Sequence, residues 1–312
     1  MSTTQAAENR LSNSVALLGA YAAKTCARKI HNDFDRTIPV VEWEPSPEMQ
    51  RLFDEGKEFE TRVLAELSET LGSDLGRIEP HLSRAESVRL TLQAMSDGVL
   101  LISNGWLPDD LAGGRQGRPD LLLRMVGDDG APHYVPGDIK AHKTLKDAKT
   151  KSALLSLPRD PATRLETPGL VEEVAGCLDD FLQLAHYSRM IDAAGHGPAQ
   201  EAREGFIIGT DEVGAEFDSR FVLTWHQLTS SLFQTFSASE GKKKRSALER
   251  YDHEHDFRLK VAKVAAERTG AVTDSAPLVK PIGQEECLEC PYEEYCGELM
   301  DGQASHEITS GR

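Results

Sequence analysis

Long apolar runs are scarce in this chain of 312 residues. The longest lies near residues 15–23 and falls well short of the roughly 18 residues that a membrane helix needs. The first ten residues also lack a basic start followed by an apolar run, which a secretory signal would require. We therefore expect a cytoplasmic protein with no membrane partner.

Positive charge is also in short supply. Lys and Arg number 35 against 51 Asp and Glu, so the formal net charge is −16. This balance argues against a protein that coats nucleic acid through bulk electrostatics, but it leaves room for an enzyme that grips phosphates in one basic groove. Aromatic residues make up only 6% of the chain and do not interleave with its lysines, so no base-stacking platform is expected.

Cysteine is limited to five residues, three of them within ten positions near the C-terminus. A disulfide framework is not expected in a cytosolic chain, so clustered cysteines suggest metal or redox chemistry. The fifth, Cys177, lies beside Leu178 and Phe181 in a predicted helix, where we expect a small buried hydrophobic residue.

The order of predicted elements is typical of an α/β (α+β) protein with a sheet core flanked by helices. Some segments show the helical period together with residues that start and stop helices, and these are predicted helices. Other segments are short β-rich runs separated by Gly, Pro and Asp, and these are predicted strands. We expect helices at 5–31, 47–71, 84–96, 171–194 and 224–269, strands within 98–141 with a hairpin turn at 127–130, and a buried strand at 206–210.

Two of the predicted strands place three chemically useful side chains together. Asp120 starts the run DLLLR, and Asp138 and Lys140 follow in PGDIK on the next strand. Side chains alternate across a strand, so Asp138 and Lys140 share a face, and the hairpin returns that face to Asp120. Two carboxylates suit a hard divalent cation that activates water, and an ammonium group can stabilise charge on a phosphodiester. A solvated surface Asp/Lys pair is the alternative, because D-x-K alone is common.

Flanking helices carry three further candidates. Glu60 lies on the helix 47–71. Gln183 and Tyr187 are four residues apart on the helix 171–194 and so share a face. The alternative for Glu60 is a solvated helical carboxylate. The Q-x-x-x-Y motif of Gln183 and Tyr187 is informative only because it follows Lys140 in the sequence. His186, between them, is expected to be a surface or packing residue.

This arrangement resembles the PD-(D/E)XK nuclease superfamily, in particular its RecB-like branch. The resemblance implies a restriction-endonuclease-like mixed sheet, with Asp120, Asp138, Lys140, Gln183 and Tyr187 catalytic. It implies metal binding by Glu60, Asp120, Asp138 and Ile139. The implied activity is Mg²⁺- or Mn²⁺-dependent hydrolysis of DNA, most often as an exonuclease on single strands or duplex ends in repair, recombination or defence. No Walker motif (G-x-x-x-x-G-K-[ST]) is present, so unwinding would come from a partner such as a helicase.

The cysteines near the C-terminus form a C-x2-C-x5-C motif of Cys287, Cys290 and Cys296, and Cys26 is the candidate fourth ligand. One cysteine before the nuclease motifs and three after them resembles RecB-like nucleases with an iron–sulfur cluster, among them the AddB nuclease domain and the CRISPR-associated RecB-like exonucleases. A [4Fe–4S] cluster needs four thiolates. Zn²⁺ is the alternative, although the split spacing differs from the usual paired ribbon.

Two basic stretches are candidate contacts to the DNA backbone. Lys143, Lys146, Lys149 and Lys151 follow Lys140, and the run KKKR occupies 242–245. Each of these stretches could equally be a solvated helix or loop face.

The predicted organisation is a nuclease domain over 1–300 and a polar tail over 301–312. The catalytic core would cover about 50–210, and a helical iron–sulfur lobe from about 11–35 and 270–300 would join the two ends of the chain. The tail would be flexible or the stub of a longer architecture. The alternatives to a nuclease are a non-catalytic nucleic-acid-binding module that keeps the fold and cluster, and a zinc-stabilised structural protein.

Overall fold

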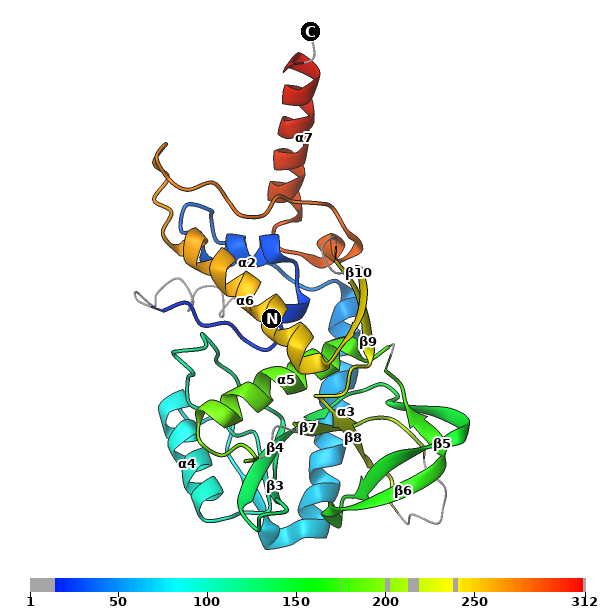
Figure 1. Ribbon diagram of the computed structural model, residues 1–312. Helices are drawn as coiled ribbons and strands as arrows, with labels where there is room; N and C mark the ends of the chain where they lie inside the picture. Colours follow the sequence, from blue (N-terminus) through cyan, green and yellow to red (C-terminus); the bar gives the residue numbers. More distant parts are fainter. Residues whose placement is uncertain (1–14, 175, 200–202, 213–218, 238–240, 311–312) are drawn as a thin grey trace. The chain divides into compact units, whose positions relative to one another are not determined.

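The structure is a computed structural model that describes residues 15–174, 176–199, 203–212, 219–237 and 241–310. The chain divides into two compact units (Figure 1). One is continuous and covers Leu52–Asp252, and the other is discontinuous and joins Met1–Arg51 with His253–Arg312. All the predicted catalytic residues lie in the continuous unit, and the four cysteines of the predicted cluster lie in the discontinuous unit.

The continuous unit is built on a mixed sheet with eight strands among the described residues, in the order β1-β2-β3-β4-β7-β8-β5-β6. The pairs β1–β2 and β4–β7 are parallel, and the other neighbours are antiparallel. The strands are β1 (Leu75–Arg77), β2 (Leu101–Ser103), β3 (Leu121–Val126), β4 (Pro132–Ile139), β5 (Leu145–Leu157), β6 (Asp160–Glu172), β7 (Glu204–Ile208) and β8 (Leu223–Gln227). The expected α/β class with a mixed sheet flanked by helices is confirmed.

The helices and a separate hairpin account for the remaining described elements. The α-helices are α2 (Ala27–Phe34), α3 (Pro47–Leu71), α4 (Arg84–Ser96), α5 (Leu178–Ala193), α6 (Ala247–Ala266) and α7 (Glu293–Ser310). Short 3-10 helices are η1 (Ala22–Lys24), η2 (Gly72–Asp74) and η4 (Glu285–Glu289), and β9 (Phe233–Ser237) pairs with β10 (Gly241–Arg245). No helix of the described residues has both the length and the apolar character needed to cross a bilayer.

The elements that sequence periodicity defined most clearly have the predicted bounds. Helix α3 buries Phe59, Val63 and Leu67 and ends where Gly72 adopts a φ of 52°. Helix α4 is capped by Ser83, whose Oγ accepts a hydrogen bond from the Glu86 amide. The turn at 127–130 joins β3 to β4 as expected.

The two faces of the sheet are covered by different helices. On one face, Leu121, Val135, Ile139 and Phe206 pack in a common core with the apolar side of α3. On the other face, α5 packs against β4 and β7. Because side chains alternate along a strand, Asp138 and Lys140 have the opposite direction to Ile139, and they lie on the face that α5 covers.

Gly137 allows the strand before Asp138 to approach its neighbour closely. A Cβ atom at this position would lie 2.1 Å from Cζ of Phe206, the residue paired with it on β7. The Phe206 ring occupies the space that a side chain at 137 would need, so glycine keeps β4 and β7 in register beside the carboxylate.

The long hairpin of β5 and β6 was not predicted. A solvated helix or loop face was the alternative for Lys143, Lys146 and Lys149, and the following helix was expected from residue 171. Instead β6 extends to Glu172 and α5 begins at Leu178. Lys143 does lie in a loop, just before β5. Lys146 and Lys149 are exposed on β5, where charged side chains are compatible with a strand because one of its faces meets solvent.

The predicted helix at 224–269 is also wrong over its first half. Strands β8, β9 and β10 occupy this segment before α6 begins at Ala247. The start of α6 is set by a capping box, because Oγ of Ser246 accepts from the Glu249 amide at 3.1 Å and Glu249 Oε2 accepts from the Ser246 amide at 2.7 Å. Of the strands upstream of that signal, β8 pairs with the earlier strands β5 and β7, whereas β9 and β10 pair with each other as a local hairpin. Strand formation here depends on these pairings and not on a local helical period.

In the discontinuous unit, the predicted helix at 5–31 is not continuous. Its residues 5–14 lie outside the described part, and the rest is broken into η1 and α2, with Cys26 at the N-cap of α2. Leu18, Ile30 and Phe34 form a small core with one side of α6. Helix α7 continues through the position where a polar tail was expected to start and ends at Ser310.

Candidate active site

The strand pairing brings Asp120 and Asp138 together. Asp120 directly precedes β3, and its neighbour Leu121 pairs with Gly137 on β4. Asp120 Oδ2 accepts a hydrogen bond of 2.9 Å from the Ile139 amide, so the backbone of β4 holds one carboxylate beside the other. The predicted convergence of these two acids is therefore present.

Burial makes the Asp120 carboxylate costly to ionise. The pKa of Asp120 is raised well above its ordinary value, first because burial disfavours the charged form and second because Asp138 is close; the Ile139 amide and the Lys140 ammonium oppose the rise. A divalent cation bound between the two carboxylates would offset the repulsion between them. A close pair of carboxylates therefore suits a metal site.

Asp138 is the most deeply placed member of the group. Its side chain is fully buried, and apart from the Lys140 ammonium and the neighbouring Asp120 carboxyl, no described residue donates a hydrogen bond to its oxygens. Lys140 Nζ lies 2.9 Å from Oδ2 and forms an ion pair with it. A buried carboxylate with unfilled acceptor sites is uncommon in a purely structural role, because each unsatisfied oxygen costs free energy. It fits a residue that ligates a cation.

Helix α5 supplies the next contact. Lys140 Nζ donates a hydrogen bond of 3.0 Å to Oε1 of Gln183, which is buried. Gln183 therefore lies beside Lys140. Tyr187, one turn further along, is also buried, and its ring would be 2.8 Å from a Cβ atom at Gly117 in the segment that leads to Asp120. Tyr187 therefore packs against the approach to the carboxylates.

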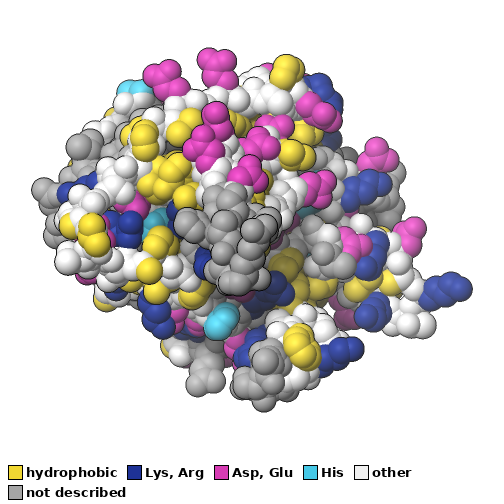
Figure 2. All heavy atoms as spheres, turned by 90° about the horizontal axis from the view of Figure 1, so that it is seen from above, with side chains coloured by type: hydrophobic (Ala, Val, Ile, Leu, Met, Phe, Trp, Pro, Cys, Tyr) yellow, Lys and Arg dark blue, Asp and Glu magenta, His cyan; other side chains and the backbone are white. Residues whose placement is uncertain are grey.

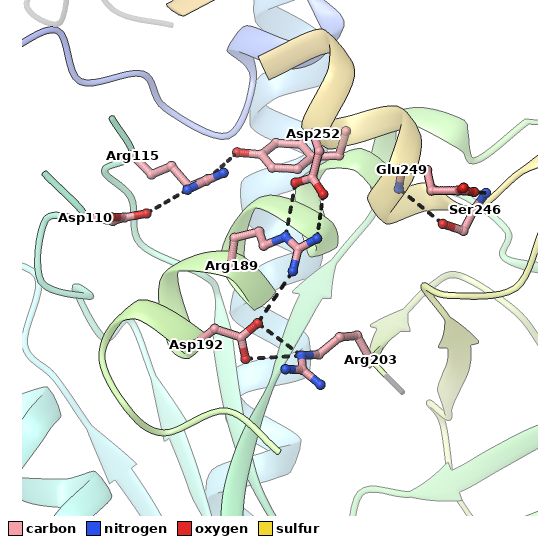
Figure 3. A network of polar contacts seen from close by, with 9 residues as sticks. Asp110, Arg115, Arg189, Asp192, Arg203, Ser246, Glu249 and Asp252 are labelled. Atoms are coloured by element: carbon pink, nitrogen blue, oxygen red, sulfur yellow. Dashed lines mark hydrogen bonds and ion pairs between the residues drawn. The ribbon is translucent and has the colours of Figure 1, made fainter. Parts of the chain in front are cut away.

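A buried polar network supports α5 and the same approach segment. His186 Nδ1 lies 2.8 Å from the hydroxyl of Tyr251, and His186 Nε2 lies 3.1 Å from the Gln116 carbonyl. Arg115 donates to the Tyr251 hydroxyl and to Asp110, as Figure 3 shows. His186 is thus a buried, hydrogen-bonded packing residue. Of the two expected roles, surface residue and packing residue, the structure shows the second.

Salt bridges continue this network along α5 (Figure 3). Arg189 Nε donates to Asp252 at 3.0 Å, and Arg203 Nε donates to Asp192 at 3.0 Å. Partly buried pairs of this kind fix side-chain geometry more than they add stability. The helix that carries Gln183 is consequently anchored at several points along its length.

Glu60 is not brought to the carboxylate pair by any contact of the described residues. It is half-buried on α3, next to Phe59, which packs in the core on the opposite face of the sheet from Asp138 and Lys140. Ile139 has a different role from that of its neighbours. Its side chain packs in that same core, while its amide holds Asp120.

The basic candidates are exposed. Lys143, Lys146 and Lys149 all reach solvent, and Lys146 Nζ pairs with Glu173 at 3.0 Å. The run at 242–245 forms β10, whose three lysines are exposed. Figure 2 shows one face of the molecule on which many Asp and Glu side chains gather, as the net charge of −16 implies. The exposed lysines of β5 and β10 therefore differ in charge from the rest of a protein that is acidic overall.

The four cysteines of the discontinuous unit lie near one another. The pKa of Cys290 is raised to about 11, chiefly by burial, with smaller contributions from the nearby thiols of Cys296 and Cys287. Burial likewise raises the pKa of Cys296, and Cys26 adds to that rise. Asn32 Nδ2 donates to Cys296 Sγ at 3.6 Å. The chain thus gathers the predicted thiol ligands from both ends of the sequence.

A group that sequence reasoning missed lies directly beyond Lys140. His142 Nε2 is 3.0 Å from Oδ2 of Asp180, and the Cys177 thiol completes a group whose donor atoms all lie within 4.8 Å of one another. Cys177 is buried, as expected, but it is not surrounded by apolar groups alone. The alternation 138, 140, 142 along the chain and the spacing of Asp180 one turn before Gln183 were the available signals.

Asp180 also changes the protonation of His142. The pKa of His142 is raised to about 10, first by its hydrogen bond with Asp180 and second by Cys177. The position between the imidazole and the carboxylate therefore prefers positive charge.

Comparison of the chain with models of protein families, with curated proteins and with solved structures found no match.

Proposed function

We propose that the protein is a metal-dependent DNA nuclease of the PD-(D/E)XK superfamily, from its RecB-like branch. The observation that carries the proposal is the environment of Asp138. This residue is fully buried, it lies beside both Lys140 and Asp120, and its oxygens have no other hydrogen-bond donor among the described residues. A solvated surface Asp/Lys pair, the alternative that the sequence left open, does not have this burial.

Asp120 and Asp138 would hold the divalent cation, Mg²⁺ or Mn²⁺. Such a cation supplies activation of water and neutralises charge on the scissile phosphate. Carboxylate oxygens are the donors that these hard cations prefer. Glu60, proposed as a further ligand from the resemblance, lacks support in the described contacts, so the two aspartates carry the site.

Lys140 has a position suited to phosphate chemistry. Its ammonium group is only partly buried and contacts Asp138 on one side and Gln183 on the other. A positive group fixed in this way can stabilise the negative charge that develops on a phosphodiester as it is cleaved. Gln183 accepts a hydrogen bond from Lys140 and so orients it, while Tyr187 packs against the segment that leads to Asp120.

The sheet supports the same superfamily. The run β2-β3-β4 is antiparallel, and after the β5–β6 hairpin α5 leads to β7, which pairs parallel to β4. This is a mixed sheet core flanked by helices, as the resemblance implies for a restriction-endonuclease-like fold. The exposed lysines of β5 are proposed contacts to the backbone of single-stranded DNA or duplex ends, with exonucleolytic cleavage in the cytoplasm and unwinding by a partner helicase.

For the four cysteines we propose a [4Fe–4S] cluster, with Zn²⁺ as the alternative. Tetrahedral zinc with bonds of about 2.3 Å would hold its thiolates roughly 3.8 Å apart. Among the described residues, the only group of three such donors within 4.8 Å is that of His142, so the four thiols are more widely spaced. An iron–sulfur cluster, which places iron and sulfide between the thiolates, tolerates that spacing better. Anaerobically purified protein should be brown and absorb near about 400 nm, whereas zinc-bound protein is colourless.

The test of the nuclease is cleavage of end-labelled single- and double-stranded DNA by anaerobically purified protein with Mn²⁺ or Mg²⁺. Lys140→Ala and Asp138→Asn should each lower the rate about 100-fold or more. Lys57→Ala and Asp128→Asn are matched controls, because both residues are exposed and lie outside the site; they should leave the rate unchanged.

Absence of cleavage by wild-type protein on either substrate would overturn the proposal. So would an unchanged rate for Lys140→Ala. Metal-independent DNA binding without turnover would instead identify the non-catalytic nucleic-acid-binding module.

A further inference from the structure

Three different donor atoms meet at the junction between β4 and α5. They are Nε2 of His142, Sγ of Cys177 and a carboxylate oxygen of Asp180, all within 4.8 Å of one another. His142 follows β4 by three residues, Cys177 is the N-cap residue of α5, and Asp180 lies in the first turn of that helix. Among the described residues this is the only group of histidine, cysteine and acidic donors with such close spacing.

We propose that His142, Cys177 and Asp180 form a binding site for one zinc-like divalent transition metal ion. Imidazole, thiolate and carboxylate are the three donor types that Zn²⁺ accepts, at distances of roughly 2.0–2.3 Å. Mg²⁺ demands oxygen ligands and is excluded by the thiol. The site is therefore chemically different from the pair of aspartates, and the proposal does not depend on the nuclease proposal.

The orientation of His142 supplies an independent indication. Its second ring nitrogen, Nδ1, lies 3.1 Å from the backbone carbonyl of Lys143. Histidines that ligate metals almost always donate the other ring N–H to a carbonyl or carboxylate, because this fixes the tautomer that presents Nε2 to the ion. The Lys143 carbonyl is outside the donor group, and it holds the imidazole in the orientation that a ligand needs.

The burial of the donors also suits a metal site with one open position. Cys177 and Asp180 are buried, whereas the side chain of His142 is 45% exposed. Three protein ligands leave a fourth position for water or another ligand. Occupation would cross-link the segment after Lys140 to the start of the helix that carries Gln183, so we expect bound metal to stabilise the protein.

The experiment uses the full chain purified anaerobically, so that the four cysteines of the discontinuous unit keep their own ligand. Zinc is removed by a mild chelator and added back, and bound zinc is counted by mass spectrometry. Wild-type protein should retain about one equivalent more than His142→Gln and Cys177→Ser. Added Zn²⁺ should also raise the melting temperature of wild-type protein and not that of these variants.

Two matched variants separate this site from the others. Cys26→Ser tests the discontinuous unit, and Asp138→Asn tests the proposed catalytic pair; both should keep the additional zinc equivalent. Zinc binding with no DNA cleavage would uphold this site while rejecting the nuclease. The metal proposal fails if wild-type protein binds no zinc at micromolar concentration. It also fails if His142→Gln binds as much zinc as the wild-type protein. In either case the group is an ion pair of His142 with Asp180 only.

Discussion

Lys140 Nζ, from the residue directly after β4, donates a hydrogen bond of 3.0 Å to Gln183 Oε1 on α5. The same ammonium group lies 2.9 Å from Asp138 Oδ2. Gln183 is buried, so water cannot take the place of its amide oxygen as the acceptor for Lys140. The lysine is therefore held between a carboxylate and an amide oxygen, and its direction depends on both.

Removing the amide should impair catalysis more than binding. We expect Gln183→Leu, which keeps the side-chain length, to lower kcat roughly 10-fold, because a misplaced charge stabilises the transition state less well. KM for a DNA substrate should change little. Single-turnover cleavage of labelled DNA measures both. Gln93→Leu, on the partly exposed surface of α4, is the control. A larger effect on KM than on kcat would place Gln183 in substrate binding.

Neutralising Asp120 should stabilise the metal-free protein. Its pKa is raised, so the folded state disfavours the ionised form that the unfolded chain adopts above about pH 4. The free energy of unfolding therefore falls as pH rises above that value. Asp120→Asn cannot ionise, so the variant does not suffer this fall at neutral pH. Each kcal/mol gained corresponds to a rise in Tm of about 2–4 °C. Calorimetry with a chelator measures the shift.

Asp128→Asn, in the exposed turn between β3 and β4, is the control and should not change Tm. Added Mn²⁺ should raise the Tm of wild-type protein and not that of Asp120→Asn. A variant that is less stable than wild type without metal would contradict the account of the carboxylate pair.

Gly137→Ala should destabilise the sheet. The added methyl group would meet the Phe206 ring at 2.1 Å, and overpacking of this kind costs about 1–3 kcal/mol. Urea unfolding measures the change, and cleavage should fall as well because Asp138 is the next residue. Gly56→Ala, on α3 with nothing within 4 Å of the new Cβ, should instead be neutral or stabilising by about 0.5–1 kcal/mol. Partial rescue of Gly137→Ala by Phe206→Leu would identify the ring as the cause.

Acid should weaken the discontinuous unit through His31. Its pKa is lowered to about 4, first by burial and then by Arg28, although Asp35 opposes the change. The unfolded histidine takes up a proton near pH 6.5 and the folded one does not, so stability is complete above pH 6.5 and is lost as pH falls toward 4. The loss should reach about 3 kcal/mol. Urea unfolding at several pH values measures it, and His31→Gln should flatten the profile in this window. Titration of the His31 ring signal near 6.5 by NMR would refute the prediction.

Exposed lysines of β5 should contribute to DNA affinity through counterion release. In the Asp138→Asn background, which prevents cleavage, Lys149→Ala should reduce the slope of log K against log salt by about 0.7–0.9. Lys146 is already paired with Glu173, so Lys146→Ala should have a smaller effect. Lys57→Ala, exposed on α3, serves as the control. Equal slopes for Lys149→Ala and wild type would exclude β5 from the DNA interface.

The predictable parts of the fold are those with strong local signals. Helix α3 ends just before Gly72, Ser83 caps the start of α4, and the turn before β4 contains Gly127 and Gly130. Each of these signals acts within a few residues. The centre of the site was predictable for a related reason. Asp138 and Lys140 share a face because of the two-residue period of a strand, and the hairpin returns that face to Asp120.

The remaining parts depend on pairing between distant residues. Strand β5 pairs with β8, some seventy residues later, and its lysines give it no apolar period. Glu60 was assigned through a resemblance of position, and its role as a metal ligand stays a prediction. His142 and Cys177 meet only because α5 returns its first turn to the end of β4, and the alternation along 138, 140 and 142 does not by itself identify Cys177 as a neighbour.

The discontinuous unit has a consequence for biosynthesis. Its first segment ends at Arg51 and its second begins at His253. During translation, Cys26 leaves the ribosome long before its three partner cysteines, while Leu52–Asp252 can complete its own sheet in the interval. Residues of α2 must therefore wait, with Ile30 and Phe34 uncovered, until α6 has been synthesised. The nascent chain is most exposed to chaperones and proteases at this stage. Truncation after residue 252 should leave the sheet folded but Leu18, Ile30 and Phe34 without the α6 side of their core.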